Sequence, residues 1–188
     1  MIRQVEYFDK GGPEHTGRCL KIVSDLVDEG YRHVVVASTR GDTGLKMAHK
    51  LSDKDVNLVV VTHSVGFKGP NQDEFSSEKR EEIMKLGGKI YTGTILTHSL
   101  ETSLMSKHSG IYPSYIITQT LRRICQGMKV GCEIIMEACD GGLIPEGEET
   151  IAVGGTGYGA DTVSIIRSVA SKRFLDLKVL EILAKPRE

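Results

Sequence analysis

The sequence predicts a three-layer α/β fold with a mostly parallel sheet and an antiparallel edge, built as a single domain over residues 1–188. Two runs of short, largely β-branched residues, 34–37 and 55–62, have the composition of strands buried on both faces, which parallel sheets contain. Segments with helical spacing of apolar residues alternate with these runs, and the connections are short. This β-α-β order implies right-handed crossovers and a parallel sheet covered by helices.

The first half of the chain shows the alternation most clearly. Apolar residues recur at near-helical spacing before Gly30, and Gly87-Gly88 ends a charged helical segment. The predicted elements are, in order, a helix around 20–27, a strand at 34–37, a helix at 45–51, a strand at 55–62, a helix from Ser76 or Ser77 to Leu86 and a strand at 89–92.

The second half has a weaker pattern. Pro113 suits the first position of a long helix, which Gly127 and Gly131 are expected to bend or interrupt. A core strand at 150–153 precedes a glycine-rich loop, and the alternating residues after that loop predict an antiparallel strand at the sheet edge. The remaining predictions are a short helix within 98–108 and a last segment, 175–180, that fits a strand or a helix.

Charge and hydropathy exclude several classes of protein. The formal net charge is −1 and no Lys/Arg cluster is longer than two residues, which argues against a nucleic-acid footprint and a polybasic membrane anchor. Charged residues within the first ten positions exclude the core of a signal peptide, and no run approaches the roughly 18 apolar residues of a membrane span. We therefore expect a soluble, cytoplasmic protein that binds neither nucleic acid nor membrane.

The four cysteines form no CxxC motif, so the sequence predicts no metal site. Cys125, Cys132 and Cys139 are seven residues apart, about two helical turns, and would share one stripe of an unbroken helix. Small buried residues on a packing face are the favoured interpretation, and a thiol relay or a metal site is the alternative.

The segment 34–48 joins the first buried strand to a helix through a turn rich in hydroxyl groups and glycine. Free backbone N–H groups at the positive end of a helix are well suited to a phosphate. Either Asp42 or Thr43 is expected to cap the helix, and Arg40 and Lys46 are available to offset phosphate charge. The candidate residues of this turn are Ser38, Thr39, Arg40, Gly41, Asp42, Thr43 and Gly44.

A second glycine-rich segment, 154–161, resembles a dinucleotide fingerprint in its spacing alone. That fingerprint opens a helix, whereas a strand pattern follows here, and only 28 residues remain after Ala160. A nicotinamide half-domain therefore does not fit. We expect instead a mobile flap that approaches a ligand closely, with a purely structural turn as the alternative.

Ligands of open parallel sheets bind beyond the carboxyl ends of the strands. His63, Gly66, Phe67 and Thr94 follow two of the predicted strands. For His63 three roles stay open: a general base, a hydrogen-bond donor to a ligand, or neither. Phe67 either packs on a ligand ring or anchors the core. Because no Ser/His/Asp order, pair of catalytic carboxylates or Walker-type lysine is present, the sequence favours binding over catalysis and leaves catalytic residues unknown.

The strand–Ser-Thr-Arg-Gly-Asp-Thr-Gly–helix pattern of 34–48 resembles the phosphate-binding turn in the C-terminal α/β domain of pyruvate kinase, and 151–169 is similar to its later ligand-covering loop. The resemblance implies that Ser38, Thr39, Gly41 and Thr43 hold one phosphate while 154–162 covers the ligand. The catalytic barrel of pyruvate kinase has no counterpart in this sequence, so its activity is not implied.

A fuller resemblance is to small stand-alone prokaryotic proteins with this fold, carried by 8–14, 60–67 and 154–162. Members of that group bind flavin mononucleotide (FMN), which implies an FMN-binding protein, with flavin-dependent oxidoreductase activity as one interpretation. The alternative is a non-catalytic sensor or regulatory domain for a sugar phosphate or nucleotide. Homo-oligomerisation stays open. The implied ligand-binding residues beyond the first turn are His63, Gly66, Phe67, Thr94, Gly154, Gly155, Thr156, Gly157, Asp161 and Thr162.

Overall fold

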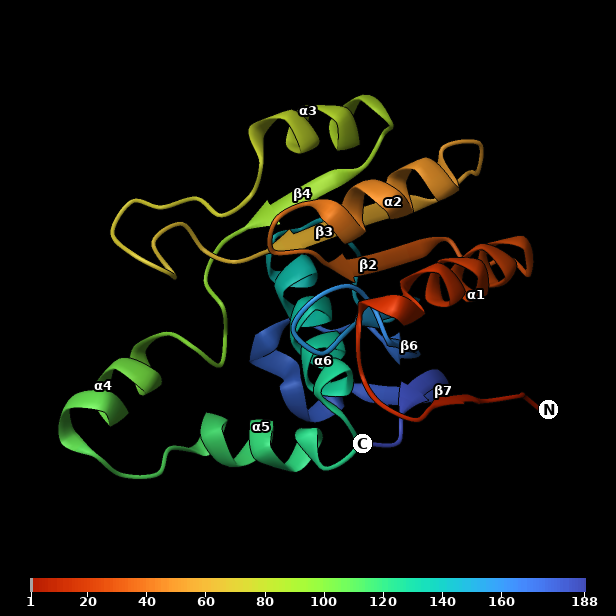
Figure 1. Ribbon diagram of the computed structural model, residues 1–188. Coiled ribbons are helices and arrows are strands. Elements are labelled where there is room, and N and C mark those ends of the chain that lie inside the picture. Colours follow the sequence, from red (N-terminus) through yellow and green to blue (C-terminus); the bar gives the residue numbers. More distant parts are fainter. Residues whose placement is uncertain (1) are drawn as a thin grey trace.

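The computed structural model describes residues 2–188, and within them seven strands form one sheet (Figure 1). The spatial order is β1-β7-β6-β5-β2-β3-β4. β6 runs antiparallel to both of its neighbours, and every other pairing in the sheet is parallel. The strands are β1 (Glu6–Phe8), β2 (His33–Ala37), β3 (Asn57–Thr62), β4 (Lys89–Thr92), β5 (Glu149–Gly154), β6 (Thr162–Arg167) and β7 (Lys178–Pro186).

Helices cover both faces of this sheet, which confirms the three-layer prediction (Figure 1). One face packs against α1, α2 and α3, and the other packs against α6, beside which α5 lies. The helices are α1 (Thr16–Asp28), α2 (Asp42–Leu51), α3 (Ser77–Lys85), α4 (Leu100–His108), α5 (Pro113–Arg122) and α6 (Gln126–Asp140), with 3₁₀ turns η1 (Pro13–His15) and η2 (Ser171–Asp176). None of the helices in residues 2–188 combines the length and apolar character needed to cross a bilayer.

The period-two geometry of β2 divides its side chains between the two cores. Val34 and Val36 pack toward α1 and α2, whereas Val35 packs toward α6. Val35 also pairs with Val59 of β3 and Ala152 of β5, in the middle of the sheet. This two-sided burial explains why residues 34–37 of the strand are all apolar, and it fixes the turn that follows at the carboxyl edge of the sheet.

Several boundaries follow the sequence prediction and others differ. Pro113 occupies the first turn of α5, and the hydroxyl of Ser76 caps α3 by accepting the N–H of Lys79 at 3.3 Å. The predicted long helix is interrupted at 123–125, before Gly127, because Cys125 Sγ accepts the N–H of Met128 and caps a new helix. Such a thiol cap is not among the usual capping residues.

The antiparallel side of the sheet is confirmed, but β6 is not its outermost strand. The ambiguous last segment forms β7, which pairs with β6, and the short N-terminal strand β1 then adds to β7.

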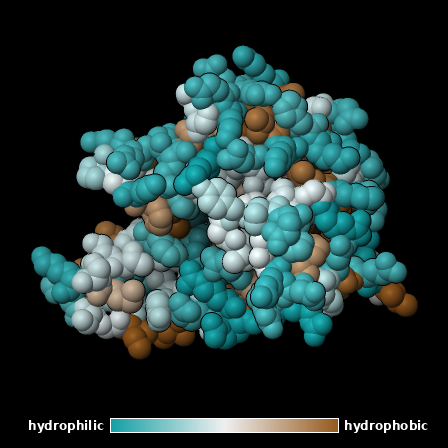
Figure 2. Space-filling model, in the orientation of Figure 1, coloured by the Kyte–Doolittle hydropathy of each residue, from teal (hydrophilic) through white to brown (hydrophobic). Residues whose placement is uncertain are grey.

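Cys125 and Cys132 are buried against the sheet and Cys139 packs beside them, as expected for a packing face. Apolar side chains gather on the surface of α4 and α5, where Leu100 and Ile111 are largely exposed (Figure 2).

Candidate functional site

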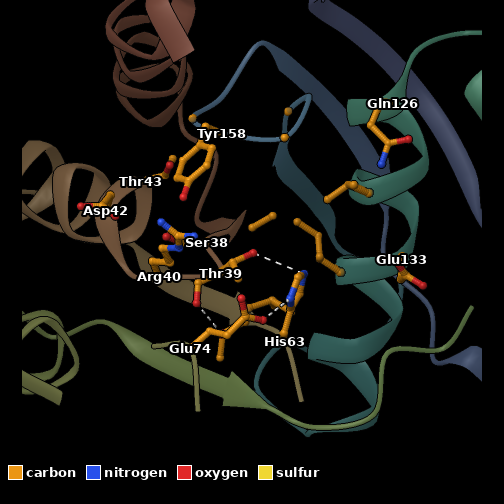
Figure 3. A pocket seen from close by; sticks show the side chains of 18 of the residues that line it. Ser38, Thr39, Arg40, Asp42, Thr43, His63, Glu74, Gln126, Glu133 and Tyr158 are labelled. Carbon is orange, nitrogen blue, oxygen red and sulfur yellow. Dashed lines mark hydrogen bonds and ion pairs between the residues drawn. The ribbon is translucent and has the colours of Figure 1, made fainter. Parts of the chain in front are cut away.

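A cavity of about 630 Å³ lies beyond the carboxyl ends of β2 and β3, where Ala37, Val61 and Thr62 form its floor. Its walls include the turn before α2, the glycine-rich loop after β5, the side of α6, and the loop that follows β3 (Figure 3). The N-terminal turn and the loop after β4 also contribute lining residues. Its volume is within the range of about 300–1,000 Å³ that is usual for small-molecule sites. The position is the one at which parallel α/β sheets bind ligands.

The turn before α2 leaves backbone donors facing this cavity. Gly41 has φ = +93°, a left-handed conformation, and a Cβ there would lie 3.0 Å from Lys79 and 3.2 Å from Phe75. The N–H of Gly44 donates to Ser38 Oγ at 3.1 Å. Within residues 2–188 the N–H groups of Asp42 and Thr43 have no acceptor, as expected for the first helical turn. Two donors at a positive helix end are thus free for an anion.

The prediction that Asp42 or Thr43 caps α2 is wrong. Gly41 occupies the N-cap position and makes no side-chain hydrogen bond. Ser38 Oγ, which lies outside the helix, accepts the N–H of Gly44 instead. The carboxylate of Asp42 instead pairs with Lys79 Nζ at 2.5 Å. This ion pair offsets the negative charge that would otherwise repel a phosphate at the turn.

Hydrogen bonds within the protein anchor the glycine-rich loop after β5. The fully buried carboxylate of Asp161 accepts the N–H groups of Gly12 at 3.1 Å and Thr156 at 2.9 Å, and the hydroxyl of Thr162 at 2.8 Å. Thr16 Oγ1 accepts the N–H of Ala160 at 3.0 Å. Asp161 therefore ties this loop to the N-terminal turn, and the loop lines the cavity through Gly155, Gly157, Tyr158 and Gly159.

The two loops meet through side chains. The guanidinium of Arg40 lies over the ring of Tyr158, 4.9 Å from its centroid. Both residues line the cavity (Figure 3), as does Lys46 on α2. The contact joins the tip of the second loop to the turn that presents the free donors.

His63, from the loop after β3, contacts two polar side chains. Its Nε2 lies 3.3 Å from Thr39 Oγ1 and its Nδ1 lies 3.0 Å from Glu74 Oε2 (Figure 3). The ring of Phe67 packs on the imidazole with centroids 4.4 Å apart. All four side chains line the cavity.

With this geometry established, a comparison with known protein families identifies the fold. Residues 20–167 match the family described as the pyruvate kinase alpha/beta domain. The chain belongs to this family. The matched range begins within α1 and ends with β6, so it includes both loops and the cavity walls from α2 to α6.

Within this pyruvate kinase alpha/beta domain, the predicted residues divide into three groups. Those lining the cavity are Ser38, Thr39, Arg40, Asp42, Thr43, His63, Phe67, Gly155 and Gly157. Those that shape the two loops without lining it are Gly41, Gly44, Gly154, Thr156, Asp161 and Thr162. Gly66 and Thr94 line a neighbouring hollow, which shares Phe67, Ile95 and His98 with the main cavity.

The wall formed by α6 was not anticipated from the sequence. Lys129, Glu133 and Glu137 are buried and line the cavity, and Lys129 Nζ pairs with Glu133. The N–H of Thr97 donates to Glu133 at 2.9 Å and that of Leu96 to Glu137 at 3.2 Å. Burial, and then the charge of Glu133, raise the pKa of Glu137 to about 8. The available signal was three charged residues spaced four apart within the otherwise apolar segment 128–138.

His98 and Glu74 also belong to the polar lining, as do Arg122 and Gln126. Burial, followed by the positive charge of Lys129, lowers the pKa of the His98 imidazole, so its neutral form is favoured. Among residues 2–188 no cluster of three or more His, Cys, Asp or Glu side chains is arranged to hold a metal ion.

Proposed function

We propose that this protein binds a phosphorylated small molecule in the cavity, with FMN as the first candidate ligand. The observation that carries the proposal is the pair of free N–H groups at Asp42 and Thr43, which open onto a cavity of about 630 Å³. A phosphate placed there would accept hydrogen bonds from these N–H groups and from hydroxyls of the turn, and the helix dipole would stabilise its negative charge.

Electrostatics near the turn suits an anion although the whole chain has a net charge of −1. A phosphate monoester carries about −1.5 to −2 charges near neutral pH. Arg40 and Lys46 line the cavity, and Lys79 neutralises Asp42. The attraction is thus local, and each charge-assisted hydrogen bond contributes roughly 1.5–3 kcal/mol.

Beyond the phosphate site, apolar and aromatic side chains support a ring-bearing ligand. Phe67, Ile95 and Ile134 line the cavity, and Tyr158 reaches it from the second loop. Aromatic and aliphatic walls of this kind bind planar rings by burial and stacking. A bound flavin would supply redox chemistry, and flavin-dependent oxidoreductase activity is the corresponding functional proposal.

A specific observation favours the second candidate function, a non-catalytic sensor of a sugar phosphate or nucleotide. The α6 wall presents buried Lys129, Glu133 and Glu137 beside the apolar Val130 and Ile134. Charged and hydrogen-bonding groups suit the hydroxyls of a sugar better than the edge of an apolar ring.

The colour of the purified protein separates the two candidates. FMN binding predicts a yellow protein with flavin absorbance, or a colourless one that recovers this absorbance when FMN is added and the excess is removed by gel filtration. A protein that retains no FMN after this treatment, yet releases heat with a sugar phosphate or a nucleotide in calorimetry, supports the sensor. Absence of binding to any of these phosphorylated ligands would contradict the proposal as a whole.

A further inference from the structure

We propose that Thr39, His63 and Glu74 form an acyl-transfer centre whose substrates are acyl phosphates. The imidazole of His63 lies between a hydroxyl and a carboxylate: its Nε2 is 3.3 Å from Thr39 Oγ1, and its Nδ1 is 3.0 Å from Glu74 Oε2. This is the arrangement by which a hydroxyl nucleophile is activated by a base that a third group orients, whatever the order in the sequence.

The contacts of His63 fix the protonation pattern that this role requires. An ionised carboxylate only accepts hydrogen bonds, so Nδ1 of the neutral ring must donate its proton to Glu74. Nε2 is then the acceptor and faces the hydroxyl of Thr39. Phe67 covers the imidazole, and the hydroxyl of Thr62 donates to the carbonyl of Thr39 at 3.2 Å. Nucleophile and base are thus both held in place.

The substrate class follows from the neighbour of the nucleophile, and it rests on the proposed phosphate binding. Thr39 lies on the same turn as the free N–H groups of Asp42 and Thr43, and all three residues line one cavity. An acyl group attached to a phosphate bound at this turn would therefore lie next to Thr39 Oγ1. Phosphate leaves as a weakly basic anion, so a single imidazole is sufficient for the acylation step.

In the first step Thr39 Oγ1 attacks the carbonyl carbon while its proton passes to His63 Nε2. The bond between that carbon and the phosphate oxygen breaks, and phosphate leaves with the electron pair and afterwards receives the proton. In the second step water attacks the Thr39 ester, gives its proton to His63, and the Thr39 oxygen recovers a proton from the imidazole. The sum is acyl phosphate plus water giving carboxylic acid plus phosphate, with no oxidant or reductant.

A second histidine–glutamate pair, His49 and Glu82, lies outside the cavity and serves as a control. His49 Nε2 lies 2.7 Å from Glu82 Oε1 between α2 and α3, with both side chains about half exposed. Neither residue lines the cavity, and within residues 2–188 no side-chain hydroxyl bonds the His49 ring. His49→Ala is consequently the control for removing a histidine from a His–Glu pair.

The experiment incubates the purified protein with acetyl phosphate, measures phosphate release, and locates acetyl groups by peptide mass spectrometry after acid quenching. We expect acetylation at Thr39, none in Thr39→Val, and a rate at least about a hundredfold lower in His63→Ala. His49→Ala should retain the wild-type rate. Circular dichroism confirms that each variant is folded, and Thr39→Ser, which keeps a hydroxyl, should still be acetylated.

Glu74 is a positioning residue and has its own test. Glu74→Ala should slow acetylation strongly, and added formate should restore part of the rate by replacing the missing carboxylate. A purely structural role for Glu74 would show no such rescue.

Two outcomes would overturn the inference: no acetylated Thr39 in the wild-type protein, or a phosphoryl group on Thr39 in place of the acetyl group. Calorimetry with FMN separates this failure from that of the proposed function. If FMN binds and Thr39 is not acetylated, only the acyl-transfer inference fails. If neither FMN nor another phosphorylated ligand binds, the phosphate site itself is wrong.

Discussion

The two glycine-rich loops that were expected to contact the ligand differ in the element that follows them and in how their backbone is anchored. In 38–44 the N–H groups of Asp42 and Thr43 have no acceptor within the described residues and open onto the cavity. In 154–161 the buried carboxylate of Asp161 accepts the N–H of Thr156, and Thr16 accepts that of Ala160. The first loop therefore offers free N–H groups at the positive end of a helix, whereas the second is anchored by an internal carboxylate.

This difference shows that glycine content does not by itself define an anion site. Both loops are glycine-rich and both follow a core strand. What separates them is a helix after the first loop and an antiparallel strand with a buried carboxylate after the second. A helix leaves its first N–H groups without intrahelical partners, whereas strand pairing and a carboxylate satisfy such groups internally.

The largest effect is expected from Asp161→Ala, which would leave the N–H groups of Gly12 and Thr156 and the hydroxyl of Thr162 without their acceptor. At roughly 1–3 kcal/mol for each unsatisfied buried group, the free energy of unfolding should fall by about 3 kcal/mol or more. Urea denaturation measures this loss. Asp53→Ala, at an exposed aspartate, should change stability by less than about 0.5 kcal/mol. Equal effects of the two changes would show that the second loop is not held by its carboxylate.

Gly41→Val comes next, and it should impair both folding and ligand binding. A left-handed residue with a side chain costs about 1–2 kcal/mol, and here the side chain would also press on Lys79 and Phe75. We expect FMN binding to fall by at least about tenfold as the turn distorts. Gly142→Val is the control, because Gly142 has φ = +66° with nothing near its Cβ position. If both variants bind FMN normally, the turn does not form the ligand site.

Thr43→Ala should reduce ligand affinity with little loss of stability. The hydroxyl lines the cavity, and one charge-assisted hydrogen bond of roughly 1.5–3 kcal/mol corresponds to a tenfold or larger rise in Kd. Calorimetry with FMN measures the change. Thr43→Ser retains the hydroxyl and should bind nearly as well as the wild type. An unchanged Kd in Thr43→Ala would remove this residue from the phosphate site.

The smallest effect is expected from Tyr158→Leu, which removes the ring beneath the Arg40 guanidinium. Because Tyr158 is 53% exposed, this contact contributes about 0.5–1 kcal/mol. The Kd for FMN should rise about two- to fivefold. Tyr158→Phe preserves the ring and should retain wild-type affinity. A loss in Tyr158→Phe as large as in Tyr158→Leu would assign the effect to the hydroxyl.

The sequence was sufficient for the buried strands and the first loop because their signals are local. The apolar run 34–37, followed by hydroxyl residues, glycine and a helix pattern, indicates a buried strand, a turn and a helix within about fifteen residues. The capping of α2 was predicted wrongly because Ser38 and Lys79, which determine it, act from outside the helix.

Non-local contacts account for what the sequence did not reveal. Glu74 becomes a partner of His63 only when the loop after β3 folds back, and the α6 charges face the cavity only after α6 packs on the sheet. The position of β6 inside the sheet likewise depends on β7 and β1 pairing across nearly the whole chain length. Periodicity reports which face of an element is buried, but not which element lies opposite.

The most direct test of the central claim is calorimetry of the unmodified protein with FMN and with riboflavin, which share the ring and differ by the phosphate. If the free N–H groups of Asp42 and Thr43 bind the phosphate, FMN makes at least two charge-assisted hydrogen bonds that riboflavin lacks. Each of these bonds contributes roughly 1.5–3 kcal/mol to the binding free energy. This predicts a Kd for riboflavin that is at least about a hundredfold higher than that for FMN. Equal affinities for FMN and riboflavin would contradict the assignment of 38–44 as the phosphate site.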